Sequence, residues 1–247
     1  MPELKLAGLE TSRSELPAWF DVAIGSSILQ YGQRLAARQL LVNTLGNIAV
    51  RSHCSYWQRE VIYTKHRGVS LEECGLEHLA VLDMQSDELL HGCFRPSLGH
   101  QMHREIMRCR ADVNATVHLH PNEVISFFAV MQWREMEYVS NDTALVMGKP
   151  PCILGEGVNV ELDVSAINRC ASDTNCIVMP SHGITSFGRD LSEAFHRAVA
   201  FTAEISRLIT SQYLSAATGK SVVYASDDDI RQMYELGEQV IYGGMHK

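Results

Sequence analysis

Apolar side chains recur at helical spacing in two long segments of the chain. The first runs from about Trp19 to Leu41, and the second from about Leu191 to Leu214. Residues three or four apart lie on the same side of a helix, so each pattern predicts an amphipathic helix with one buried face. In the second segment we expect that face to carry Leu191, Ala194, Phe195, Ala198, Phe201, Ile205 and Leu208.

Shorter apolar runs between these segments are typical of strands. They cover residues 48–51, 60–63, 79–83, 114–120 and 176–179, and turn-forming residues separate several of them. Pro96 and Ser97 are residue types found at helix starts, which predicts a helix through Met107, and a further helix is expected from Val124 to Met131. Strands that alternate with helices in this way indicate the α/β class.

The domain organisation predicted from this pattern is simple. No internal repeat and no low-complexity linker divides the chain. Residues 1–17 are polar, and we expect them to form a loose N-terminal arm. Residues 18–247 are then expected to form a single domain.

The composition narrows the classes of function. The chain has 247 residues, 46% of them apolar, and a formal net charge of −8. The apolar share can build a core, whereas the acidic balance argues against a nucleic-acid partner. No apolar run reaches the roughly 18 residues that a membrane span needs, so no membrane association is expected. A small anionic substrate is compatible with the acidic net charge, since backbone N–H groups and one arginine can hold a phosphate locally.

The cysteines indicate in which cellular compartment the protein is expected. Seven are scattered along the chain, and no CxxC pair occurs. An odd count at irregular spacing indicates free thiols rather than a disulfide framework. Together with the lack of a recognisable signal peptide, this predicts a cytoplasmic protein.

Two histidines on a predicted strand are the first candidates for chemistry. His118 and His120 are two residues apart, so their side chains point to the same face. Two neighbouring imidazoles can chelate one cation. The alternative is a pair of ordinary satisfied histidines, because the chain contains 11 of them.

His182 is the third candidate ligand. It follows the apolar run 176–179 and precedes Gly183, and we expect a helix after that glycine. Ligands often collect at such strand ends, although a plain turn is the alternative. Three histidines with an open fourth position describe a Lewis-acid metal site. We expect one divalent ion per subunit. Zn²⁺ suits imidazole best, with Co²⁺, Mn²⁺ and Fe²⁺ as alternatives.

The order of these motifs resembles that of the class II aldolase/adducin family, which includes fuculose-phosphate aldolase and ribulose-5-phosphate 4-epimerase. The resemblance covers about residues 23–214. It rests on the combination of segments 44–51 and 110–120, Gly68, Pro96-Ser97 with His103, Ser181-His182-Gly183, and a long helix containing Glu204.

The resemblance implies a three-layer α/β/α sandwich around a central, mainly antiparallel sheet. It also implies a homo-oligomer, often a tetramer, with active sites near the subunit interfaces. His118, His120 and His182 correspond to the family's metal-binding histidines. The positions that correspond to the pocket for the substrate's phosphate or carboxylate are Gly46, Asn47, Gly68 and Ser97.

The implied chemistry is the cleavage of a carbon–carbon bond in a small hydroxy-carbonyl or sugar-acid substrate. The metal binds adjacent substrate oxygens and stabilises the enediolate that remains, and a protein group moves the proton. The aldolases carry a glutamate where this chain has Gly99, and a phosphate-contacting serine where it has Leu98. A catalytic tyrosine has no match around residues 151–154. Glu123 and His100 are therefore candidate replacements for the acid/base.

Three functions remain open at this stage. The first is a metal-dependent lyase of aldol or decarboxylation type, and Gly99 puts standard aldolase activity in doubt. The second is a sugar-phosphate epimerase of the same family. The third is a non-catalytic interaction domain like the adducin head, which the retained histidines disfavour. Three arginines compete as partners for a substrate anion, namely Arg51, Arg67 and Arg95.

Overall fold

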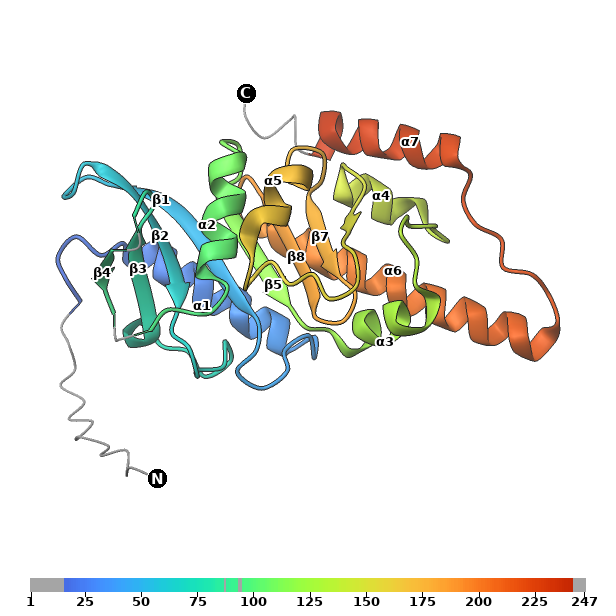
Figure 1. The fold of residues 1–247 in the computed structure, drawn as a ribbon, viewed down its shortest axis with the longest axis horizontal. Helices are drawn as coiled ribbons and strands as arrows, with labels where there is room; N and C mark the ends of the chain where they lie inside the picture. Colours follow the sequence, from blue (N-terminus) through green and yellow to red (C-terminus); the bar gives the residue numbers. More distant parts are fainter. Residues whose placement is uncertain (1–15, 87, 93–94, 242–247) are drawn as a thin grey trace.

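The computed structural model describes residues 16–86, 88–92 and 95–241 (Figure 1). The predicted N-terminal arm lies almost wholly outside these residues. The strands are β1 (Asn47–Cys54), β2 (Arg59–Lys65), β3 (Leu79–Asp83), β4 (Leu89–His91), β5 (Ala115–Leu119), β6 (Cys152–Ile153), β7 (Cys176–Met179) and β8 (Gly183–Gly188). The α-helices are α1 (Val22–Ala36), α2 (His100–Cys109), α3 (Asn122–Met131), α4 (Asn141–Met147), α5 (Ile167–Cys170), α6 (Leu191–Thr218) and α7 (Asp227–Leu236).

The eight strands of the described residues form one sheet, in the order β4-β3-β2-β1-β5-β8-β7-β6. Every neighbouring pair is antiparallel except β6 and β7, which run parallel. β5 lies at the centre, where Asn47 of β1 faces His118 and Ile184 of β8 faces Leu119. Residues far apart in the chain therefore meet at the centre of the sheet.

Helices cover both faces of the sheet, which confirms the α/β class and the three-layer arrangement. On one face the buried core includes Ile28 of α1, Phe127 of α3 and Phe195 of α6. On the other face it includes Met102 of α2 and Ile167 of α5. Figure 1 shows α1 and α6 behind the sheet and α2 and α5 in front of it. Successive side chains of a strand point to opposite faces, so one strand serves both cores.

The helical pattern predicted for residues 191–214 is confirmed. α6 begins at Leu191, where the Asp190 side chain accepts a hydrogen bond from the Glu193 backbone N–H at 2.8 Å. All seven positions expected on its inner face are buried. Among the residues that the structure describes, no helix is both long enough and apolar enough to cross a membrane.

One expectation about the order of elements is wrong. A helix does not follow His182 and Gly183 directly, because strand β8 lies between them and α6. The segment contains Thr185 and Ser186, whose hydroxyl groups do not suggest a buried strand. Both are fully buried because each hydroxyl has a partner, the His118 ring at 2.9 Å and the Ala194 carbonyl at 2.7 Å.

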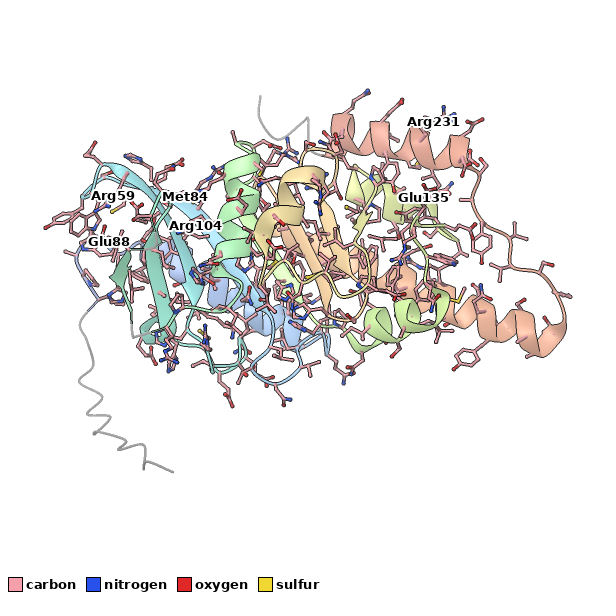
Figure 2. The ribbon with its side chains drawn as sticks, in the orientation of Figure 1. Arg59, Met84, Glu88, Arg104, Glu135 and Arg231 are labelled. Atoms are coloured by element: carbon pink, nitrogen blue, oxygen red, sulfur yellow. The ribbon has the colours of Figure 1, made fainter. Side chains whose placement is uncertain are left out.

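Arginines fix α2 and its flanking segments to the sheet. Arg104 of α2, labelled in Figure 2, donates to the carbonyl of Ser86 in the loop after β3. Arg51 of β1 donates to backbone carbonyls of the α2–β5 connection, including Ala111 at 2.7 Å. These bonds satisfy carbonyls that no regular element satisfies, and they hold α2 over the centre of the sheet.

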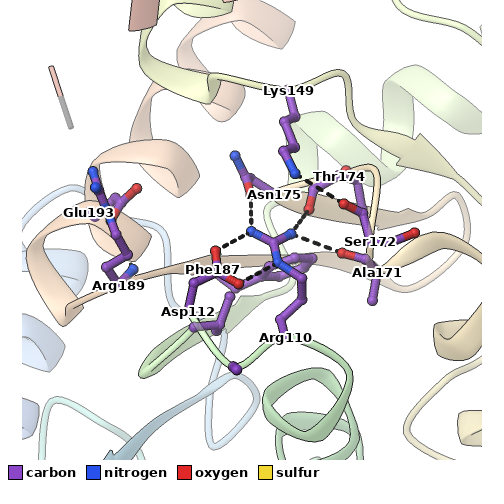
Figure 3. A network of polar contacts seen from close by, with 12 residues as sticks. Arg110, Asp112, Lys149, Ala171, Ser172, Thr174, Asn175, Phe187, Arg189 and Glu193 are labelled. Carbon is purple, nitrogen blue, oxygen red and sulfur yellow. Dashed lines mark hydrogen bonds and ion pairs between the residues drawn. The ribbon is translucent and has the colours of Figure 1, made fainter. Parts of the chain in front are cut away.

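Arg110 ties that connection to the segment before β7. Its guanidinium donates to the carbonyls of Ala171 and Thr174, both at 2.9 Å, and to Asn175 Oδ1 at 3.2 Å (Figure 3). The carboxylate of Asp112 accepts two further bonds at 2.7 Å. The network joins the connections that lead into β5 and β7, two strands whose ends carry the histidines.

Candidate metal centre

Successive side chains of β5 point to opposite faces of the sheet. Ala115, Val117 and Leu119 enter the core under α6. His118 points to the α2 face, and His120 follows the strand on that same side. Their Nε2 atoms lie 2.9 Å apart, as the i and i+2 spacing predicts.

His182 reaches this pair from a hairpin turn. Residues 180–182 connect β7 to β8, and the His182 backbone N–H donates to the Met179 carbonyl at 2.9 Å. Its ring centroid lies 5.2 Å from that of His118 and 4.3 Å from that of His120. The three histidines named by the sequence pattern therefore converge at one end of the adjacent strands.

A glutamate that the sequence did not single out completes the group. Glu161 lies in the loop between β6 and α5, and only 9% of its side chain is exposed. Its Oε1 lies 3.6 Å from His118 Nε2 and its Oε2 lies 3.1 Å from His182 Nε2. One potential ligand atom from each of His118, His120, Glu161 and His182 lies within 4.8 Å of all the others.

The charge states of these groups suit a cation. Burial lowers the pKa of His118 well below its ordinary value and that of His120 to about 4, so both rings are neutral at pH 7. Burial would raise the pKa of Glu161, but the hydrogen bond from His182 and the nearby imidazoles outweigh it and lower this pKa to about 2. His118 and His120 therefore offer nitrogen lone pairs, and Glu161 offers an ionised carboxylate.

The donor geometry also fits a divalent ion. His118 Nδ1 lies 2.9 Å from the Ile184 carbonyl oxygen, which can only accept, so the ring proton sits on Nδ1 and the Nε2 lone pair faces the group. Two nitrogens bound to one tetrahedral Zn²⁺ at about 2.0–2.1 Å are about 3.3 Å apart. The separations of 2.9, 3.1 and 3.6 Å found here bracket that value.

Asn47 is oriented beside the centre by a buried relay. Its Oδ1 accepts from His103 Nε2, and His103 Nδ1 accepts from the Thr116 hydroxyl at 2.7 Å. Burial lowers the pKa of His103 to about 3, so the ring is neutral and carries its single proton on Nε2. Because Oδ1 is engaged in this way, the amide N–H₂ group of Asn47 is left to donate to a ligand.

The glycines and the serine expected around an anion lie in the segments that precede β1, follow β2 and precede α2. Gly46 has a φ of +79°, and a side chain there would meet the His118 carbonyl at 3.0 Å. Gly68 also has positive φ, at +84°, and lies in an exposed turn. Ser97 is buried, and its backbone N–H donates to the Lys65 carbonyl at 2.9 Å. The turn after β2 and the segment before α2 therefore run side by side.

The remaining candidates are not members of the histidine–glutamate group. Glu123 is exposed in the first turn of α3 and is not a member of the group. His100 stands at the start of α2, where its Nδ1 lies 2.8 Å from the Ser97 carbonyl. The Arg51 guanidinium is engaged with backbone carbonyls, whereas Arg67 and Arg95 are exposed. Sequence proximity to the ligands had suggested Glu123, but the loop carboxylate of Glu161 is the one brought to them.

Comparison with known proteins agrees with this architecture. L-fuculose phosphate aldolase of Methanococcus maripaludis is 25% identical over 164 residues, which are 64% of this chain and 81% of that protein. The 5-deoxy-D-ribulose 1-phosphate aldolase of Bacillus thuringiensis is 24% identical over 180 residues, 72% of this chain and 81% of that protein. The solved structure of an L-fuculose 1-phosphate aldolase has the same fold, with a TM-score of 0.71 at 18% identity over 88% of this chain and 97% of that one.

The sequence model of one family spans most of the chain. It is described as the Class II Aldolase and Adducin N-terminal domain, and it matches residues 26–206. This range includes β1 to β8 and most of α6, and with them the three histidines, Glu161 and Asn47. The chain belongs to the class II aldolase and adducin family.

Proposed function

We propose that this protein is a metal-dependent lyase that cleaves a carbon–carbon bond in a small, anionic hydroxy-carbonyl substrate. The observation that carries the proposal is the convergence of His118, His120, His182 and Glu161 within 4.8 Å. A purely structural or scaffolding domain has no need for three imidazoles and a buried carboxylate at one point. Family membership supports a lyase of aldol type.

The donor set suits Zn²⁺ best among divalent ions, because three imidazole nitrogens and one carboxylate oxygen are ligands that Zn²⁺ commonly takes. When bound, such an ion polarises a substrate carbonyl and stabilises negative charge on its oxygen during bond cleavage. His118 contributes a lone pair that its bond to the Ile184 carbonyl holds in place. His182 is held by the β7–β8 turn, so the ligands approach from two directions.

The neighbouring residues are proposed to bind and orient the substrate. Asn47 presents its amide donors beside the centre, held by His103 and Thr116. Gly46 lets the backbone pass close to a ligand because it carries no side chain. With Ser97 and Gly68, these residues are the proposed pocket for the phosphate or carboxylate of the substrate. The acid/base roles considered for His100 and Glu123 stay predictions.

The experiment is an assay of carbon–carbon bond cleavage with purified protein. L-fuculose 1-phosphate and 5-deoxy-D-ribulose 1-phosphate, the compounds named for the relatives, are the first substrates to test, followed by 3-keto and 2-hydroxy sugar acids. Fragment analysis separates the reaction types: an aldol cleavage releases an aldehyde, a decarboxylation releases CO₂, and an epimerisation releases neither.

We expect cleavage that a chelator abolishes and added Zn²⁺ or Co²⁺ restores. His118→Ala should lose activity, since it removes a ligand. His53→Ala is the matched control, because His53 is an exposed histidine of β1 outside the group. Full activity after thorough removal of metal, or in His118→Ala, would rule the proposal out.

A further inference from the structure

Gly99 occupies a position where a side chain would collide with the candidate metal centre. A Cβ atom there would lie 2.6 Å from Glu161 Oε1 and 2.7 Å from Asn47 Oδ1. Its backbone does not require glycine, because its φ of −71° and ψ of −1° are in the right-handed helical region. Glycine is therefore explained at this position because the Glu161 carboxylate occupies the space that a side chain would need.

The loop that carries Glu161 is built to direct the carboxylate inward. The side-chain oxygen of Asn159 accepts a hydrogen bond from the Glu161 backbone N–H at 2.9 Å. The backbone carbonyl of Asn159 accepts from the backbone N–H groups of Leu162 and Asp163 at 3.1 and 3.0 Å. The amide nitrogen of Asn159 also lies 3.4 Å from His182 Nδ1. This tight turn leaves Leu162 76% exposed while the Glu161 side chain is only 9% exposed.

We infer that Gly99 and Glu161 work as a pair, in which the missing side chain of one makes room for the other to reach the metal as its fourth protein ligand. This inference rests on the proposed function. Four protein ligands would close a tetrahedral site, whereas a catalytic site keeps one position for substrate. The histidines stand within β5 or directly beside the ends of β5, β7 and β8, whereas Glu161 lies in the irregular loop between β6 and α5, so Glu161 is the ligand that would make way for substrate. Asn159 is a positioning residue that holds it.

Metal titration of the chelator-treated protein tests the pair without an activity assay. Zn²⁺ affinity is measured by calorimetry, and the visible spectrum of the Co²⁺ form reports the number and kind of ligands. Loss of a group that supports a metal typically weakens affinity about 10–100-fold, so Glu161→Gln should weaken Zn²⁺ binding at least about 10-fold and change the Co²⁺ spectrum. Glu156→Gln is the control, because Glu156 is an exposed carboxylate of the same loop.

A double-mutant cycle then tests the coupling between the two positions. Gly99→Ala places a methyl group 2.6 Å from the Glu161 Oε1 position, so it should weaken Zn²⁺ binding about as much as Glu161→Gln does. The double variant should bind no more weakly than either single variant, since both remove one interaction. Far-ultraviolet circular dichroism is used to compare the folding of each variant with that of the wild type.

The outcomes separate this inference from the function on which it rests. Glu161→Gln that binds Zn²⁺ with unchanged affinity and an unchanged Co²⁺ spectrum overturns the inference, while loss of binding in His118→Ala would still support the proposed metal centre. Additive effects of Gly99→Ala and Glu161→Gln also overturn it, because the two positions would then act independently. A wild-type protein that binds neither ion removes the basis of both.

Discussion

Gly183 follows the turn that carries His182 and begins β8, which pairs with β5, the strand that carries His118. Its φ is +148°, and a Cβ atom at this residue would lie 2.1 Å from the Leu119 carbonyl oxygen. That oxygen belongs to backbone rather than to a side chain, so it moves only if β5 and β8 separate. Gly183→Ala therefore combines a conformation that other residues disfavour with a steric overlap.

The two effects can be given magnitudes. An unfavourable backbone region costs about 1–3 kcal/mol, and overpacking of a well-packed site costs about 1–3 kcal/mol. Gly183→Ala is expected to lower the free energy of unfolding by about 2–6 kcal/mol, a large part of the roughly 5–15 kcal/mol typical of a domain. Because Leu119 lies between His118 and His120, the same displacement should weaken Zn²⁺ binding.

Gly157→Ala is the control for the backbone contribution alone. Gly157 has a φ of +74°, and nothing lies within 4 Å of the Cβ position. A left-handed residue with a side chain costs about 1–2 kcal/mol, so this variant should be only mildly destabilised and should keep its metal affinity. Urea unfolding followed by circular dichroism gives both free energies. Equal destabilisation of the two variants would refute the close approach of Leu119 to Gly183.

Three further predictions concern the metal, the buried relay and the arginine network. Zn²⁺ at 100 times its Kd should stabilise the protein by about 2.7 kcal/mol and raise Tm by about 5–10 °C, and His120→Ala should lose this shift in a thermal scan. The folded pKa of His103, about 3, lies below the unfolded value of 6.5, so protonation favours the unfolded chain as the pH falls through this window. Stability should therefore drop by about 2 kcal/mol from His103 between pH 7 and pH 5, and urea unfolding of His103→Gln should show a weaker pH dependence than that of the wild type. Arg110→Met leaves buried carbonyls without a donor and should cost about 2–4 kcal/mol by the same assay, whereas Arg231→Met, on the exposed side of α7, should change nothing measurable.

Local patterns predicted the elements that determine most of the fold. The inner face of α6 and the runs at β3 and β7 follow from the spacing of apolar residues, because burial of a single face imposes that spacing. The shared direction of His118 and His120 follows from the geometry of a strand. β8 was missed because its buried hydroxyls, such as that of Thr185, have partners that only the folded chain supplies.

The part of the site contributed by loops could not be predicted from the sequence. Glu161 stands in an irregular segment, where no periodicity indicates which residues turn inward. Its direction depends on the turn that Asn159 forms two residues earlier and on the room left at Gly99, a residue that is near it only in the folded chain. Proximity along the chain instead favoured Glu123, which the fold places at an exposed helix start. The gap at Gly99 was visible in the sequence, but the residue that fills it was not.

Three histidines from two separate segments are proposed to hold one divalent ion. The most direct measurement is the metal content of the protein after chelation, reconstitution with Zn²⁺ and gel filtration, determined by mass spectrometry. We expect about one ion per chain in the wild type and none in His182→Ala. A full complement of metal in His182→Ala, or no metal in the reconstituted wild type, would contradict the account.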